Sequence, residues 1–226
     1  MKPSIELVYV YPNIPGNGYH SYAERFVASY LQHPPLVEHS TTVVCNGGAP
    51  DLEAQGLFAC LPDVTFLTGS NAAYDISAYQ EASEQSQADM IVFFGASAYV
   101  RVTGWLLRMA SAFKKHGDAQ YGCMGNRGTG NIHPHLRTTG FWTTPRIFNR
   151  YPHKITHPEL RHPFEHGPQC FTDYVTRLGL QSWLITAEGD YLWAQWDEAP
   201  GGLHRGNQEN LLTGDRLSEH PFHHCS

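Results

Sequence analysis

The stretch from residue 71 to residue 113 constrains the fold more than any other part of the chain, because a strand pattern lies between two helix patterns. At its centre, Ile91–Phe94 is a short apolar run bounded by Asp89 and Gly95, which is typical of a strand covered on both faces. After Gly104, apolar side chains recur at i, i+3, i+4 and i+7, which predicts one helix face made by Leu106, Met109, Ala110 and Phe113. A buried strand between helices is a basic unit of α/β proteins.

The segment before this strand is mostly polar, which predicts a surface helix over residues 75–87, capped by Asp75 or Ser77. In α/β proteins ligands bind beyond the carboxyl ends of the strands. Residues 95–97 follow the buried strand directly. We therefore expect a binding site at this turn.

Strand and helix patterns alternate through much of the chain. A helix is predicted after Gly18 and stopped near Pro34, and strands are predicted at residues 5–11, 41–45, 63–67 and 91–94. This alternation predicts an α/β protein with a mainly parallel sheet and right-handed crossovers. Residues 183–186 are predicted to form the last strand.

A second helix pattern follows Glu165. Pro168 suits the first turn of a helix, and an apolar stripe follows at Phe171, Tyr174, Val175 and Leu178. Glu165 is therefore expected just before a helix N-terminus, where the helix dipole favours a carboxylate.

Composition excludes several classes of protein. The chain has 226 residues, which suits one domain, and its 41% hydrophobic residues are enough for a packed core. A net charge of −6 with no basic run disfavours nucleic-acid binding, which depends on neutralising phosphates. No stretch approaches the roughly 20 apolar residues of a membrane span, and the apolar run at the N-terminus is too short for a signal peptide. The five cysteines form no CxxC pair, so we expect reduced thiols in a cytoplasmic protein.

Histidines are numerous. There are 14 of them, but they form no HExxH motif, so zinc binding is only weakly indicated. The terminal stretch 220–226 is predicted to be a solvated tail. A histidine-dependent metal enzyme stays open as an alternative.

Two later segments carry groups that suit a ligand. Residues 122–131 hold four glycines and allow close backbone approach, but they form no GxxxxGK[ST] phosphate loop. Residues 191–217 combine aromatic rings with planar hydrogen-bonding groups, which suit a sugar.

The order of elements over residues 5–190 resembles that of a GT-A glycosyltransferase, the nucleotide-sugar-dependent fold of the family-2-like group. Residues 71–80 and 88–94 resemble the segment that leads into the Asp-x-Asp metal motif of that group. Gly104-Trp105-Leu106 and residues 164–179 resemble two later motifs. The resemblance implies that Glu165 is the base that deprotonates the acceptor hydroxyl.

One departure from the family pattern is large. Gly95-Ala96-Ser97 stands where the metal-binding carboxylates of the family should be, and neutral groups are poor ligands for Mg²⁺ or Mn²⁺. Cationic side chains could offset the diphosphate charge instead, because arginine binds phosphate in a bidentate way; the candidates are Arg101, Arg127, Arg137 and His204. Loss of donor chemistry is a second option, and metal held by other ligands, for instance His204 with Asp215, is a third.

The resemblance implies a single GT-A-like domain over residues 1–226, with a nucleotide-binding half at 1–117 and an acceptor-binding half at 118–226. It implies donor contacts from Tyr11, Asn13, Asp75, Ser97, Arg101, Arg127 and Arg137. It implies acceptor contacts from Trp142, His166, Trp196 and His204. The expected activity is transfer of a sugar, hexosyl by resemblance, from a nucleoside diphosphate to a glycan or other hydroxyl. The transfer is expected to invert the configuration, and transfer without a metal is one of the alternatives. A role in polysaccharide biosynthesis is expected, and the alternative is a non-catalytic relative that binds nucleotide or glycan.

Overall fold

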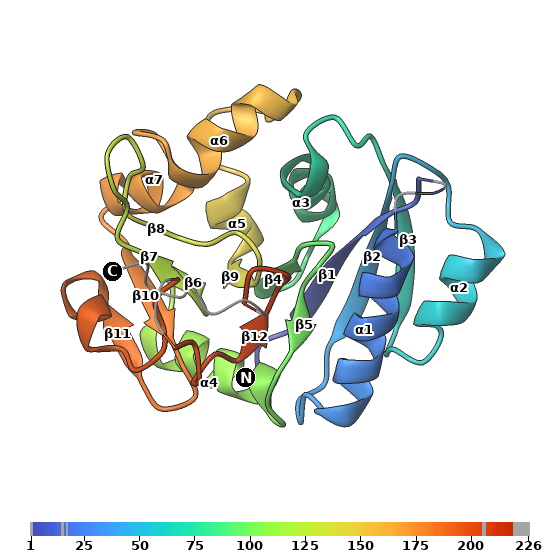
Figure 1. Cartoon of the computed structure of the whole chain (residues 1–226), viewed down its shortest axis with the longest axis horizontal. Helices are drawn as coiled ribbons and strands as arrows, with labels where there is room; N and C mark the ends of the chain where they lie inside the picture. Colours follow the sequence, from blue (N-terminus) through green and yellow to red (C-terminus); the bar gives the residue numbers. More distant parts are fainter. Residues whose placement is uncertain (1, 15, 17, 205–206, 219–226) are drawn as a thin grey trace, which may run out of the picture.

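The computed structural model describes residues 2–14, 16, 18–204 and 207–218. The stretch 220–226, predicted to be a solvated tail, lies outside the described residues. The described chain forms one domain around an eight-stranded sheet of order β11-β10-β6-β9-β4-β1-β2-β3 (Figure 1). In chain order these strands are β1 (Ile5–Pro12), β2 (Ser40–Asn46), β3 (Val64–Gly69), β4 (Met90–Phe94), β6 (Ala119–Gly122), β9 (Phe141–Thr143), β10 (Gln181–Ile185) and β11 (Asp190–Leu192).

The sheet is mainly parallel, which confirms the sequence prediction. Strands β3, β2, β1 and β4 run parallel, with Tyr9 of β1 opposite Val43 on one side and Phe94 on the other. Strand β9 is antiparallel to both β4 and β6, and the edge strand β11 is antiparallel to β10. Two small two-stranded sheets accompany it, formed by β5 (Tyr99–Val100) with β12 (Thr213–Gly214) and by β7 (Gly125–Asn126) with β8 (His135–Leu136).

Helices cover both faces of the sheet. One face packs on α1 (Tyr19–Gln32), α2 (Leu52–Phe58) and α4 (Trp105–His116). The other packs on α3 (Tyr74–Gln85), α5 (Pro145–Phe148), α6 (Pro158–His166) and α7 (Phe171–Arg177). The 3₁₀ helix η1 (Trp193–Glu198) follows β11.

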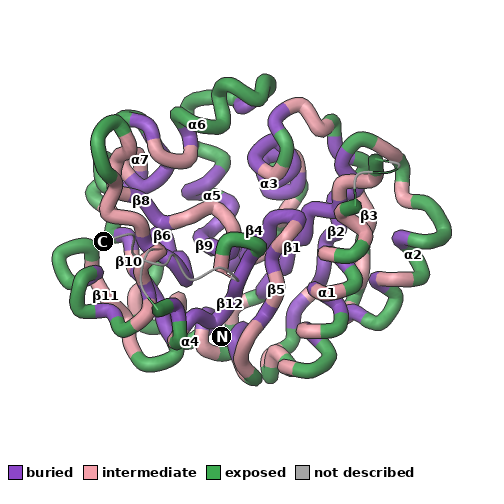
Figure 2. Tube along the Cα trace, viewed as in Figure 1, coloured by how far each residue is buried: buried purple, intermediate pink, exposed green. Residues whose placement is uncertain are grey.

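Alternation along the central strands explains why both faces are apolar. In β1, Leu7 and Tyr9 belong to the core on the α1 side, while Val8 and Val10 belong to the core on the α3 side. All five residues of β4 are buried, as the apolar run Ile91–Phe94 predicted. Figure 2 shows the buried central strands between more exposed helices. Burying each large apolar side chain contributes about 1.5–3 kcal/mol, so this doubly covered strand is a main source of stability.

Helix α3 differs from the prediction of a capped surface helix. Its N-cap is Ala73, with no side-chain cap, and Ser77 instead accepts a hydrogen bond from the Ala73 N–H. Most of the helix is buried, including polar Gln80, whose side chain bonds the backbone of His153 and Ile155. The polar sequence predicts exposure to solvent, but the Gln80 side chain forms internal hydrogen bonds with the backbone of residues 153 and 155.

Three other predictions are wrong. Glu165 lies in the last turn of α6, not before the N-terminus of a helix, and Pro168 lies in the turn between α6 and α7. Residues 183–186 are not the last strand, because β11 and β12 follow.

No helix within the described residues is long and apolar enough to cross a bilayer.

Candidate functional site

A cavity of about 490 Å³ opens beyond the carboxyl ends of β1, β2 and β4, where the strand pattern predicted a binding site. The loops after these strands form one wall, and α6 with the segment after β12 forms the other. Its lining comprises Pro12, Ile14, Tyr19, Asn46, Asn71, Tyr74, Asp75, Ala96, Ser97, Arg137, Thr139, Arg161, Glu165, Asp215, Arg216 and Leu217. We call this the large cavity.

A second cavity of about 190 Å³ adjoins the first, and we call it the small cavity. Its lining comprises Asn126, Ile132, His135, Arg137, Thr138, Thr139, Glu165, His166, His204 and Leu217. Arg137, Thr139, Glu165 and Leu217 line both cavities, so these four residues form a shared wall.

Asp75 lies in the first turn of α3, and its carboxylate reaches the turn after β4. It accepts a hydrogen bond from the Ala96 N–H, and the ideal Cβ position at Gly95 lies 2.5 Å from its Oδ2. The helix dipole favours a carboxylate here, but burial is the stronger effect: burial and the nearby Glu165 charge raise the pKa of Asp75 to about 6. Asp75 therefore changes its protonation state close to neutral pH.

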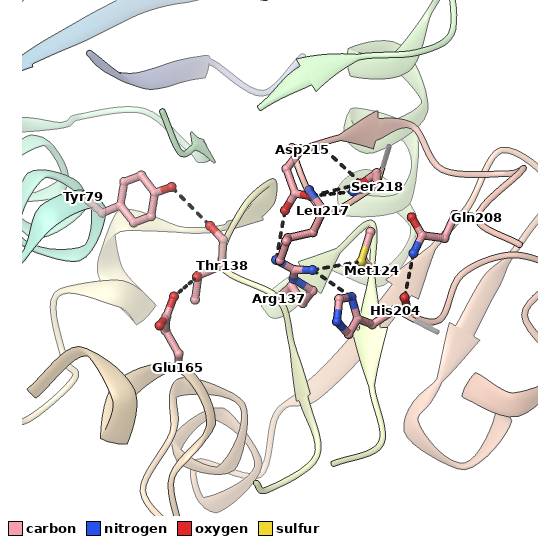
Figure 3. Close-up of polar contacts among 10 residues, drawn as sticks. All are labelled: Tyr79, Met124, Arg137, Thr138, Glu165, His204, Gln208, Asp215, Leu217 and Ser218. Atoms are coloured by element: carbon pink, nitrogen blue, oxygen red, sulfur yellow. Dashed lines mark hydrogen bonds and ion pairs between the residues drawn. The ribbon is translucent and has the colours of Figure 1, made fainter. Parts of the chain in front are cut away.

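Glu165 is held in place from two directions, one of which Figure 3 shows. Its Oε1 accepts a hydrogen bond from the Thr138 hydroxyl at 2.6 Å. Its Oε2 lies 3.3 Å from Nε of Arg161, one helical turn earlier in α6. The Arg161 guanidinium also lies 5.4 Å from the centre of the Tyr74 ring. These contacts fix the carboxylate in the shared wall.

Arg137 connects the C-terminal segment to the shared wall (Figure 3). Its guanidinium donates to Oδ2 of Asp215 at 3.0 Å and to Nδ1 of His204 at 2.8 Å. The other oxygen of Asp215 accepts from the backbone N–H groups of Leu217 and Ser218. Because a cation already lies between His204 and Asp215, the suggestion that these two residues bind a metal together is wrong.

Asn46 organises the wall of the large cavity beyond β2. Its side-chain oxygen accepts from the Asn71 N–H, and its amide donates to Oδ1 of Asn71 and to the Tyr74 carbonyl. Both Asn71 and Tyr74 have positive φ, at 55° and 54°. A non-glycine residue in this region stores strain, which a functional wall often carries.

The structure brings together only part of the predicted site. Asp75, Ser97, Arg137 and Glu165 line the large cavity, while His166 and His204 line the small one. Four predicted donor contacts lie outside both linings: Tyr11, Asn13, Arg101 and Arg127.

These four residues have other partners. Tyr11 is buried with its hydroxyl 3.1 Å from Nδ1 of His20, and the Asn13 side chain donates to the Ala49 carbonyl. Arg101 donates to the Gln208 carbonyl, and Arg127 pairs with Asp197.

The acceptor role predicted for Trp142 and Trp196 is wrong. Both side chains are fully buried, and Trp142 stacks on Tyr121 with ring centres 5.4 Å apart. A ring with no exposed face cannot stack on a sugar. Residue type alone does not distinguish a core ring from an exposed one.

Sequence reasoning missed several lining residues. Arg161 lies four residues before Glu165, a spacing that signals an ion pair on one helix face. Asn46 directly follows the strand predicted at residues 41–45 and so lies at the expected edge of the site. Nothing in the sequence pattern distinguishes Arg216, which lies near Asp75 only because β12 returns to pair with β5.

The usual metal site of this fold does not fit the residues after β4. Gly95, Ala96 and Ser97 offer no carboxylate, and Asp75 is the acid that reaches this turn. Within the described residues, no group of three His, Cys, Asp or Glu side chains could hold a metal ion. The described residues of this turn therefore do not fit a divalent metal ion.

The sheet order, the helices on both faces and the cavity beyond β1, β2 and β4 define a GT-A-like glycosyltransferase fold. A mannosyltransferase from Pyrobaculum calidifontis, solved in complex with GDP-Man and Mn²⁺, has a similar structure: TM-score 0.51, 10% identity, 67% of this chain and 47% of that chain covered.

TarS from S. aureus is a further neighbour, with TM-score 0.49, 12% identity, 66% of this chain and 30% of that chain covered. The chain thus spans less than half the length of both proteins. Its sequence matches no protein-family profile and no curated protein sequence.

Proposed function

We propose that the protein is a glycosyltransferase that moves a sugar from a nucleoside diphosphate to a hydroxyl of a glycan or other acceptor. One observation carries the proposal: Glu165 lies in the wall shared by the two cavities. A donor in the large cavity and an acceptor in the small cavity would meet at this carboxylate. The large cavity is at the edge of the sheet where α/β proteins bind nucleotides, which supports the donor assignment.

In the proposed reaction, the acceptor hydroxyl gives its proton to Glu165, and its oxygen forms a bond to the anomeric carbon of the donor sugar. The bond from that carbon to the diphosphate oxygen breaks, and its electron pair leaves with the diphosphate. Attack opposite the leaving group inverts the configuration. Thr138 and Arg161 hold the carboxylate in one orientation, as a general base requires.

Arginines in the large cavity would stabilise the departing diphosphate. Arg137, Arg161 and Arg216 all line it. Arg137 and Arg161 already pair with Asp215 and Glu165, so Arg216, which is exposed, has the most freedom to bind phosphate oxygens. This assignment replaces Arg101 and Arg127, which lie outside the cavity, and makes metal-independent transfer part of the proposal.

The proposal also retains the finer expectations: a hexosyl donor, a glycan acceptor, a role in polysaccharide biosynthesis and a cytoplasmic location. Residues 1–117 would form the nucleotide-binding half and residues 118–226 the acceptor-binding half, although the arginines proposed for the diphosphate come from the second half. The loops after β1, β2 and β4 support the first assignment, because they line the large cavity and come from the first half; the other wall of that cavity comes from the second half.

The test is thermal unfolding with UDP, GDP, dTDP or CMP, each with EDTA and with Mn²⁺. A ligand at about 100 times its Kd adds about 2.7 kcal/mol, a readily measured increase in Tm. We expect one nucleotide to stabilise the protein in EDTA. A shift that requires Mn²⁺ would overturn the metal-independent part, and no shift with any nucleotide would overturn the donor assignment.

A second function is favoured by the neutral Gly95-Ala96-Ser97 turn: a non-catalytic relative that binds nucleotide or glycan. It predicts nucleotide stabilisation without turnover of any nucleotide sugar. Transfer of a sugar that is lost in Glu165→Gln would exclude it. The histidine-dependent metal enzyme would require stoichiometric metal in the purified, untagged protein.

A further inference from the structure

We propose that the small cavity binds an uncharged, hydroxyl-rich end group of the acceptor, such as a neutral sugar ring, and that His135 and His166 recognise its hydroxyls. This inference rests on the proposed function, because it names the acceptor class of the same site.

The charged groups of the small cavity are already compensated. Arg137 and Glu165 are the charged side chains in its lining, apart from its imidazoles. Arg137 donates to Asp215, whose side chain is only 5% exposed, and Glu165 accepts from Thr138 and pairs with Arg161. A charged acceptor group would therefore have to displace an existing ion pair, at a desolvation cost that a neutral group avoids.

The remaining polar groups are the uncharged side chains of Asn126, Thr138 and Thr139 and the imidazoles. Nδ1 of His135 lies 2.7 Å from the His133 carbonyl, which requires a proton on Nδ1 and leaves Nε2 as a hydrogen-bond acceptor. Burial lowers the pKa of His135 to about 4, and burial also lowers the pKa of His166. The two rings lie 5.5 Å apart, so they face the same small volume.

His204 also lines the small cavity, and its Nδ1 is a hydrogen-bond acceptor, whereas the Nδ1 of His135 is a donor. The Nδ1 of His204 accepts from the Arg137 guanidinium at 2.8 Å, which places its ring proton on Nε2. The cavity therefore combines neutral donors and acceptors, and a hydroxyl group, which both donates and accepts, complements this pattern. The volume of about 190 Å³ suits an end group rather than a nucleotide.

The experiment compares acceptors on the wild-type protein and on two variants. The probes are methyl glycopyranosides, as neutral acceptors, and glucuronic acid and glucose 6-phosphate, as charged ones. They are assayed with the nucleotide sugar whose nucleotide stabilises the protein. Donor hydrolysis to water is measured in parallel, because it needs the donor and no sugar acceptor. The variants are His166→Phe, which removes a polar group from the small cavity, and His153→Phe, a matched control at an exposed histidine outside both cavities.

We expect transfer to a neutral glycoside at least tenfold faster than to either charged probe. His166→Phe should reduce this transfer at least tenfold while nucleotide stabilisation and donor hydrolysis stay within twofold, and His153→Phe should change none of them. Preference for a charged probe, or unchanged transfer in His166→Phe, would overturn the inference and leave the donor assignment intact. Absence of nucleotide stabilisation in the wild type would overturn both.

Discussion

The carboxylate of Asp75 occupies the space that a side chain at Gly95 would need, since a Cβ at position 95 would lie 2.5 Å from the Asp75 Oδ2. The same Cβ would lie 3.1 Å from the Tyr79 hydroxyl. The acid at the exit of β4 is therefore supplied by helix α3 rather than by the strand itself. Gly95 and Asp75 are complementary, and a change at one constrains the other.

Gly95→Ala should destabilise the protein by about 1–3 kcal/mol, the usual cost of forcing a methyl group into a packed site. It should also weaken nucleotide stabilisation, because Asp75 and Ser97 line the large cavity. Urea unfolding measures the first effect and thermal shift the second. Gly56→Ala is the matched control: its Cβ meets nothing within 4 Å in helix α2, so it should stabilise by about 0.5–1 kcal/mol. Equal behaviour of the two variants would contradict the packing argument.

Asp75→Asn should make the protein more stable at neutral pH. The folded-state pKa of Asp75 is about 6 and its ordinary value is 3.8, so its contribution to stability is present below pH 4 and lost as pH rises through 6. Two pKa units correspond to roughly 3 kcal/mol. We expect the stability difference between variant and wild type to grow from pH 4 to pH 7, as measured by urea unfolding. Glu159→Gln, an exposed acid in α6, should show no such growth. A stability difference between Asp75→Asn and the wild type that does not change with pH would contradict the raised pKa of Asp75.

The fold was predictable because its strongest signals are local. The doubly covered strand at 91–94 and the helix after Gly104 both depend on residue spacing alone, and both are present. The polar helix α3 misled the prediction, because its buried polar groups bond to residues about 70 positions later, such as His153. Spacing within a helix contains no information about such partners.

The site was predictable only in part. Asp75 and Glu165 were found through order of elements and residue type, and both line the large cavity. Arg216 could not have been found, because its place depends on β12 pairing with β5 across more than 100 residues. Trp142 illustrates the opposite error: an aromatic residue that suits a sugar in principle is a core residue here.

Asp215→Ala should destabilise the protein by about 3–5 kcal/mol, because it leaves the Arg137 guanidinium buried without its carboxylate. Their side chains are only 15% and 5% exposed. Asp197→Ala breaks an ion pair with Arg127 in which Asp197 is 70% exposed, and it should cost no more than about 1 kcal/mol. Urea unfolding compares the two variants. In addition, the double variant Arg137→Met/Asp215→Leu should lose less free energy of unfolding than the sum of the two single variants. Strict additivity of the two losses would argue against a coupled ion pair between Arg137 and Asp215.

Glu165→Gln should abolish sugar transfer and keep nucleotide binding. Glutamine preserves the size of the side chain and can still accept from Thr138, but it cannot take the acceptor proton. A general base contributes typically 10²–10⁴-fold, so we expect transfer to fall by at least about 100-fold. Nucleotide stabilisation in EDTA should stay close to wild type, because in the proposed mechanism arginines, and not Glu165, bind the diphosphate. Glu159→Gln, in the first turn of the same helix, should leave both measurements unchanged. Transfer that persists in Glu165→Gln would assign the base to another residue, and loss of nucleotide binding would mean that Glu165 supports the donor site instead.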